Sequence, residues 1–409
     1  MHAESVGDYL KGSNQLARAV ILNQHTNNYG DDAAGVALAS SLVGALGVDT
    51  VDIFYIWQKN GAGLGLAAPT FNDHLIPELS GENDIRASLA ISIAKNVVFK
   101  RPLPTWLQQL VTTSKEADNV FVSPAGSNIG IYKDWTYLFV LLALVTNGVR
   151  PIFFQNTIGS SNSRLFNLVA KYVLRRSELN VRELKTQKWL AQQGMSSYLG
   201  VDTAVLLEQS AQITAANDTD YIALVPTRLG NWHRDFRQFD EKTLVDGVLV
   251  QAIAATANAR NLRVKIVPHL YGPEGEAPYL QSILEQFTQA GCSAEIVTTE
   301  SYLDYMGALA QASAVVSMRY HGLILAAHAG VPCVSLAYEN KMVEAATYLG
   351  LGDLCRHVAE MSKDELAELL ASALDRKDSY RELMKERLVL LQDIARGPLK
   401  AAQARSLRG

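Results

Sequence analysis

One stretch near the carboxyl end constrains the fold more than any other part of the chain. Residues 314–317 are apolar and typical of a short buried strand, and residues 323–329 have the composition of a helix. Gly330 suits the left-handed residue that follows a helix. Residues 333–338 are again apolar and β-prone. The stretch therefore predicts a strand, a helix and a second parallel strand, with residues 319–322 as the turn into the helix.

Charged side chains follow both of these predicted strands. Arg319 and His321 come after the first strand, and Glu339 and Lys341 come after the second. In a right-handed strand-helix-strand unit, both carboxyl ends open on the same edge of the sheet, beside a helix amino terminus that favours anions. Taken singly, each of these residues is more often a solvated surface residue. Together they predict a site for a small substrate with several negative charges.

Strands and helices alternate twice along the rest of the chain, with a polar stretch between the two series. The pattern predicts an α/β protein with two doubly wound domains that face a central cleft. We place an N-terminal domain at 1–205, a linker at 206–220, a C-terminal domain at 221–360 and a helix with a tail at 361–409. A capping sequence at Ser362 predicts one long helix to about residue 395.

Composition excludes several classes of protein. The formal net charge of −4 argues against a nucleic-acid binder, and the three cysteines form no metal-ligand pattern. We therefore expect no metal. No apolar run is long enough to span a bilayer, and the amino terminus has no signal core. We expect a cytoplasmic protein with at most peripheral association with the inner face of a membrane.

The loop after the first strand, near residue 28, is the second informative stretch. Asn28 and Gly30 permit unusual backbone angles, and Asp31 or Asp32 can cap the helix that follows. This loop is either a capped turn or a place where Asn28, Gly30 and Asp31 approach a ligand in the cleft. Asn156 and Arg228 also follow predicted strands and are further candidates for substrate contact, although a plain loop explains Arg228 equally well.

These motifs together resemble those of the polysaccharide pyruvyl transferases. The resemblance covers about residues 18–360 and includes a spacing of 20 residues between His321 and Lys341. The motifs that carry it are Asn28-Tyr29-Gly30-Asp31, Val181-Arg182-Glu183, Asp202, Arg319-Tyr320-His321 and Lys341.

The resemblance implies a GT-B-like fold and transfer of the enolpyruvyl carbon skeleton of phosphoenolpyruvate to a sugar as a pyruvate ketal. It places Arg182, Arg319, Tyr320, His321 and Lys341 in donor binding or catalysis. No cofactor is implied besides the donor substrate. The expected partners are phosphoenolpyruvate and a saccharide acceptor that is lipid-linked, nucleotide-linked or polymeric, without nucleic acid, and the oligomeric state is open.

The chemistry explains the residue types independently of the family. Arginine forks match carboxylate and phosphate, lysine supplies a point charge, and histidine can act as the general acid that protonates the donor methylene carbon. Two loops depart from the family pattern, residues 124–127 and 155–160, and both are expected to face the cleft. Two other functions remain open: a GT-B glycosyltransferase that uses a nucleotide sugar, and a non-catalytic binding subunit of a polysaccharide assembly complex.

Overall fold

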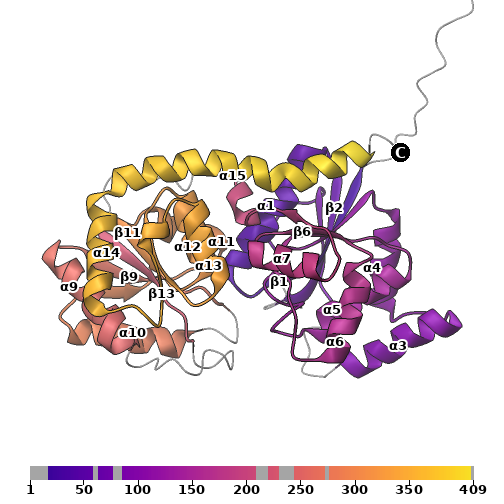
Figure 1. The fold of residues 1–409 in the computed structure, drawn as a ribbon, viewed down its shortest axis with the longest axis horizontal. Helices are drawn as coiled ribbons and strands as arrows, with labels where there is room; N and C mark the ends of the chain where they lie inside the picture. The colour runs from indigo at the N-terminus through magenta and orange to yellow at the C-terminus, as the bar shows by residue number, and fades with distance from the viewer. Residues whose placement is uncertain are drawn as a thin grey trace, which may run out of the picture.

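The computed structural model contains two parallel sheets, each covered by helices on both faces, which lie side by side along the long axis of the molecule (Figure 1). It describes residues 17–58, 63–76, 85–208, 220–229, 244–271 and 276–406. We call the first sheet with its helices the N-terminal domain and the second the C-terminal domain. The α/β architecture of two doubly wound domains is therefore confirmed. The predicted linker lies largely outside the described residues.

The N-terminal sheet has seven parallel strands in the order β3-β2-β1-β4-β5-β6-β7. Its strands are β1 (Arg18–Thr26), β2 (Thr50–Gln58), β3 (Phe71–His74), β4 (Asn119–Val122), β5 (Ile152–Asn156), β6 (Glu178–Val181) and β7 (Tyr198–Leu199). Its helices are α1 (Tyr29–Leu46), α3 (Arg86–Phe99), α4 (Thr105–Glu116), α5 (Trp135–Thr146), α6 (Arg164–Leu174) and α7 (Leu184–Gln192). The central strands are buried on both faces, as expected of a parallel sheet.

The C-terminal sheet has six parallel strands in the order β10-β9-β8-β11-β12-β13. Its strands are β8 (Tyr221–Val225), β9 (Arg263–Ile266), β10 (Ala294–Ile296), β11 (Ala314–Ser317), β12 (Cys333–Ala337) and β13 (Cys355–His357). Its helices are a π-helix (Val245–Val250) that runs into α9 (Gln251–Ala259), then α10 (Ala277–Gln289), α11 (Tyr302–Ala310), α12 (Tyr320–His328) and α13 (Asn340–Tyr348). Gly330 has a φ of 73°, as predicted for the residue after α12.

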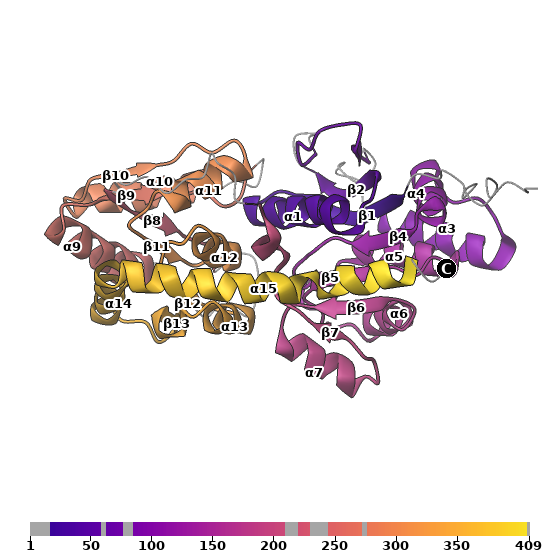
Figure 2. The same ribbon diagram turned by 90° about the horizontal axis from the view of Figure 1, so that it is seen from above.

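The carboxyl end of the chain differs from the prediction of one long helix. Ser362 does cap a helix, but that helix, α14 (Lys363–Asp375), ends at Arg376 and α15 (Lys377–Ser406) continues in a new direction. Figure 2 shows α15 running along both domains. Its far half is held to the N-terminal domain by hydrogen bonds from the Gln392 amide to the Val205 carbonyl and from the Tyr198 hydroxyl to the Ile394 carbonyl.

Three elements of the N-terminal half were not predicted from the sequence. Strand β3 is only four residues long, and none of its residues is fully buried. Helix α3 buries only Leu89 and Ile93, and α4 follows it directly. Among the described residues, every helix is too short or too polar to cross a bilayer.

Candidate active site between the two domains

The turn from β11 into α12 places the Arg-x-His motif at the face between the domains. The Ser317 hydroxyl accepts a hydrogen bond from the Arg319 amide (3.0 Å) and donates one to the Arg319 carbonyl (2.9 Å). Arg319 is consequently the N-cap residue, and Tyr320 and His321 lie in the first turn of the helix. The prediction of a turn over residues 319–322 is wrong, because this double contact ends the strand and starts the helix within two residues.

The Tyr320 side chain lies at the centre of the site and contacts three of its other residues. Its ring is almost fully buried, with the Arg182 guanidinium carbon 4.8 Å and the Lys341 ammonium 5.7 Å from the ring centroid. Both distances lie within the range of cation–π attraction. The His321 ring is 5.2 Å away, edge to face. The contact between Arg182 and Tyr320 crosses from one domain to the other, so both domains build this site.

His321 lies between two carboxylates of the N-terminal domain. Its Nε2 is 3.5 Å from Oδ2 of Asp202, and its Nδ1 is 3.8 Å from Oδ1 of Asp31. Asp202 also accepts from the Arg182 guanidinium at 2.7 Å. Burial alone would raise the pKa of Asp202, but the charges of His321 and Arg182 outweigh it and lower that pKa, so Asp202 is a carboxylate at neutral pH. This carboxylate can stabilise positive charge on the imidazole.

Arg182 follows β6 and is itself buried, with 2% of its side chain exposed. Besides Asp202, it donates from Nε to the Thr157 hydroxyl at 3.2 Å. Burial would lower the pKa of Arg182, but the neighbouring Tyr320 and Asp202 raise it, so the guanidinium stays charged. Its contacts fix Asp202 beside His321.

Arg319 and Lys341 each carry a carboxylate partner of their own. Arg319 is paired with Glu276 and Lys341 with Glu339, and all four side chains are largely buried. The Nε of Arg319 is buried without a hydrogen-bond partner among the described residues. The cations are therefore held in place before any anionic substrate arrives, and the buried Nε of Arg319 can still donate to one.

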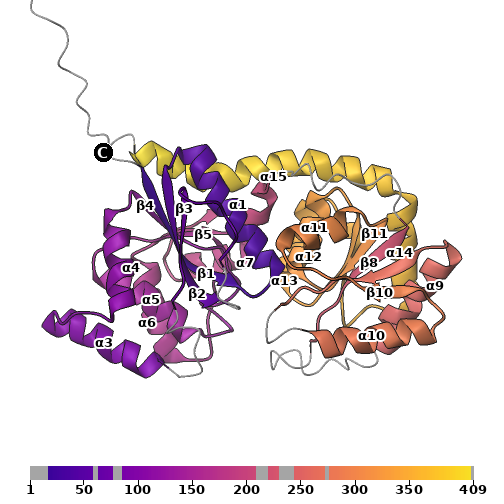
Figure 3. The same ribbon diagram turned by 180° about the vertical axis from the view of Figure 1, so that it is seen from behind.

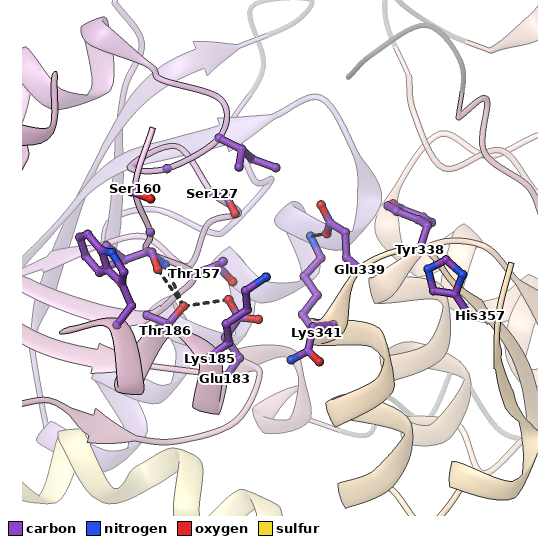
Figure 4. A pocket seen from close by; sticks show the side chains of 16 residues that line it. Ser127, Thr157, Ser160, Glu183, Lys185, Thr186, Tyr338, Glu339, Lys341 and His357 are labelled. Carbon is purple, nitrogen blue, oxygen red and sulfur yellow. Dashed lines mark hydrogen bonds and ion pairs between the residues drawn. The ribbon is translucent and has the colours of Figure 1, made fainter. Parts of the chain in front are cut away.

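A cavity of about 500 Å³ lies beside Lys341 and is lined by both domains (Figure 4). In Figure 4 the Lys341 ammonium lies beside the Glu339 carboxylate and faces the wall that carries Ser127 and Thr157. Residues of both loops that depart from the family pattern line it, as expected. The lining residues that the sequence did not single out are Gly130, Ile131, Lys185, Thr186, Trp189, Tyr338, Asn340 and His357.

Asn28, Asn156 and Arg228 were also predicted to contact substrate, but they are not among the residues that line this cavity. The Asn28 side chain caps α1, accepting from the Asp31 amide and donating to its carboxylate, both at 2.7 Å. Asn28 is thus the cap, and not Asp31 or Asp32. Asn156 is buried and donates to the Ser123 carbonyl at 2.8 Å. Arg228 is exposed three residues after β8, and its role stays a prediction.

Gly30 is required by the close approach of the two domains. A Cβ atom at this position would lie 2.2 Å from Nδ1 of His321, whereas one at Gly44, in the same helix, would meet nothing within 4 Å. Gly30→Ala should therefore displace the imidazole and lower activity, while Gly44→Ala should keep activity and add about 0.5 to 1 kcal/mol of helix stability. Turnover and thermal melting of the two variants test this. Equal activity in both would show that His321 does not need its observed place.

The same loop joins the domains through backbone contacts. The Tyr29 amide donates to the His269 carbonyl, and the Tyr271 amide to the Asn27 carbonyl. The Tyr271 hydroxyl donates to Asp32 at 2.7 Å, across the domain boundary. Burial raises the pKa of Asp32 to about 8, and the adjacent carboxylate of Asp31 adds to the effect. Asp32 is therefore largely protonated below that pH.

This carboxyl predicts a pH-dependent stability. The pKa of Asp32 is about 4 in the unfolded chain and about 8 in the folded one, so between these pH values the folded state binds more protons. The free energy of unfolding therefore falls as the pH rises from about 4 to about 8. Asp32→Asn keeps the contact with Tyr271 neutral and should flatten this part of the profile. Melting temperatures of both proteins across this range test it. Parallel profiles would exclude Asp32 as the titrating group.

Comparison with solved structures defines the class of fold. A putative UDP-N-acetylglucosamine 2-epimerase from Listeria monocytogenes superimposes with a TM-score of 0.64 at 10% identity, covering 97% of this chain and 98% of that one. The UDP-GlcNAc 2-epimerase from Neisseria meningitidis bound to UDP-GlcNAc gives 0.58 at 10% identity, with 94% and 99% covered. Sucrose-phosphate synthase from Thermosynechococcus elongatus gives 0.59 at 13% identity, with 96% and 98% covered. The fold is therefore GT-B.

The chain belongs to the polysaccharide pyruvyl transferase family, whose sequence model matches residues 28–340. The match spans both domains and includes every residue of the group around Tyr320 except Lys341, which lies one position beyond it. The resemblance drawn from the motifs is thereby confirmed, and the chain is a transferase of polysaccharide biosynthesis. Comparison with curated proteins gave no match.

Proposed function

We propose that this protein transfers the pyruvyl group of phosphoenolpyruvate to a saccharide, forming a pyruvate ketal and releasing phosphate. The observation that carries the proposal is the group of Arg182, Tyr320, His321 and Lys341, which both domains build beside a shared cavity. Family membership supports pyruvyl transfer. The volume of about 500 Å³ suits a small donor together with part of a sugar.

The charges of the site suit this donor. Phosphoenolpyruvate carries a carboxylate and a phosphate, together about three negative charges at neutral pH. Lys341 and the free Nε of Arg319 offer charge-assisted hydrogen bonds to these groups. The carboxylates of Glu276 and Glu339 hold the cations in position, and donor binding adds anionic partners to both pairs.

His321 is the proposed general acid. It donates a proton to the methylene carbon of the donor, which makes C2 an oxocarbenium-like electrophile. A sugar hydroxyl adds to C2, the C2–O bond to phosphate breaks, and a second hydroxyl of the same sugar closes the ketal. One of the two hydroxyl protons leaves with phosphate, and the other restores the proton that His321 donated. Asp202 and Asp31 support the charged imidazole between turnovers.

The N-terminal wall of the cavity suits the acceptor. It presents the hydroxyls of Ser127, Thr157 and Ser160 and the indole of Trp189. Hydroxyl groups match the hydrogen-bonding groups of a sugar, and an aromatic face can pack on its apolar side. The sugar must offer two hydroxyls close enough to share one carbon, as the 4- and 6-hydroxyls of a hexose do.

Release of phosphate tests the proposal and separates it from its rivals. The protein is incubated with phosphoenolpyruvate and a panel of hexoses, N-acetylhexosamines and their nucleoside diphosphate derivatives, and phosphate and nucleotide are followed together. Exchange of solvent deuterium into the donor methylene group reports protonation without the right acceptor. We expect acceptor-dependent phosphate release. Nucleotide release from nucleotide sugars would instead indicate a glycosyltransferase, and donor binding without either reaction would indicate a non-catalytic subunit.

A further inference from the structure

Two helices of the N-terminal domain expose large apolar side chains in addition to those that they bury. Among the described residues, fifteen large hydrophobic side chains are exposed, and seven of these lie on α3 and α6. They are Ile91, Val97, Val98, Phe99, Leu165, Leu168 and Tyr172, and the most exposed, Phe99, has 69% of its surface in contact with solvent. Helix α6 buries Phe166, Ala170, Val173 and Leu174 on its opposite side, so its exposed residues form a second apolar stripe.

The same two helices are rich in positive charge. Residues 86–101 contain four lysines or arginines and no acidic residue, and residues 163–176 repeat that composition, although the whole chain carries a formal charge of −4. The exposed members beside the apolar side chains are Lys95, Lys100, Arg101, Arg164, Arg175 and Arg176. The Arg176 guanidinium lies 3.7 Å from the centroid of the Tyr172 ring. We call these exposed apolar and basic residues together the α3–α6 face.

The α3–α6 face lies at one edge of the molecule. Both helices pack on α5, and Figure 3 shows them at the edge opposite α15, with α3 projecting away from the sheet. The surface is therefore formed by two outward helix faces, and neither helix contributes a residue to the lining of the cavity at Lys341. A projecting surface of this kind can insert into a deformable partner, such as a lipid surface, that has no preformed complementary groove.

We propose that the α3–α6 face docks the protein on an anionic lipid bilayer. Apolar side chains that enter the boundary between headgroups and acyl chains, flanked by lysines and arginines that meet anionic headgroups, are the two components of interfacial binding. The basic surplus on an otherwise acidic chain favours an anionic partner, and the exposed Phe99, Leu165 and Leu168 favour one with an apolar interior. This surface is separate from the cavity at Lys341, so the inference does not depend on the proposed reaction.

Vesicle sedimentation of the full chain tests the inference. We expect binding to vesicles rich in phosphatidylglycerol, weak binding to pure phosphatidylcholine, and loss of binding at high salt. Lys100→Gln combined with Arg101→Gln should weaken binding about 25-fold, since each basic residue near such a surface contributes about fivefold. Val98→Ser combined with Phe99→Ser should weaken it about tenfold or more.

Matched variants on α15 serve as controls. Val389 and Leu390 are exposed to a similar degree, and Lys385 and Arg387 are exposed basic residues on the same helix. Serine at the first pair or glutamine at the second should leave vesicle binding unchanged, and all variants should melt like the wild type. Equal effects of both sets, or no binding to anionic vesicles, would overturn the inference. So would a wild-type dimer that the α3 variants convert to a monomer without changing vesicle binding, because the face would then join two copies.

Discussion

Replacing His321 with alanine should lower turnover by about 100-fold or more while phosphoenolpyruvate still binds. A positioned general acid contributes about 10²- to 10⁴-fold, and the cations that hold the donor are untouched by this change. His321 lies between Asp202 and Asp31, whose carboxylates support a charged imidazole. Steady-state kinetics with phosphate detection, together with calorimetry for the donor, measure both quantities.

His321→Asn is the matched control for this prediction. Asparagine keeps a polar side chain of similar reach in the first turn of α12 but cannot act as an acid at neutral pH. It should be as slow as the alanine variant, and it should also lose deuterium exchange at the donor methylene group. Activity restored by asparagine would show that His321 positions a group and does not transfer the proton.

Local sequence patterns predicted strands and a helix end correctly where full burial or a special backbone conformation restricts the choice of residue. The strands β11 and β12 are buried on both faces, and Gly330 adopts the left-handed conformation that ends the intervening segment. The predicted boundaries of both strands accordingly lie within one residue of the observed ones. The sequence also placed the Arg-x-His motif and Lys341 on one sheet edge, because topology alone determines that.

Helices and strands without a clear buried face could not be predicted from the sequence. Helix α3 buries two residues and exposes four other large apolar ones, so its apolar residues are not confined to one face. Strands β3 and β13 are short edge strands, and neither has a run of apolar residues. No glycine or proline marks the break between α14 and α15 at Arg376, and α15 runs along both domains beyond it.

The partners of the site cations could not be predicted either. Arg319 and Glu276 are 43 residues apart, and His321 and Asp202 belong to different domains. Such pairs depend on how loops from non-adjacent strands meet, and no local pattern records this. Gly30 was interpreted as a residue that permits unusual backbone angles or approaches a ligand, whereas in the structure its missing side chain leaves room for the His321 ring.

Arg319→Lys should weaken donor binding by about 10- to 150-fold, although the charge is kept. Arginine can satisfy Glu276 from one side of its fork and a substrate carboxylate or phosphate from Nε, which is buried without a partner among the described residues. Lysine has one ammonium and cannot serve both groups in this geometry. A lost charge-assisted hydrogen bond at a desolvated site is worth about 1.5 to 3 kcal/mol, which sets the expected range.

Calorimetry at fixed salt measures this effect, with Arg260→Lys as the matched control. Arg260 forms a two-pronged pair with Asp375 on the surface between α9 and α14, at 2.6 and 3.0 Å. An exposed pair of this kind contributes little, so its lysine variant should bind the donor as the wild type does. Wild-type affinity in Arg319→Lys would place the anion site away from the β11–α12 turn. The donor would then have to be held by Lys341 and the cavity wall alone, and Arg319 would serve only to anchor Glu276.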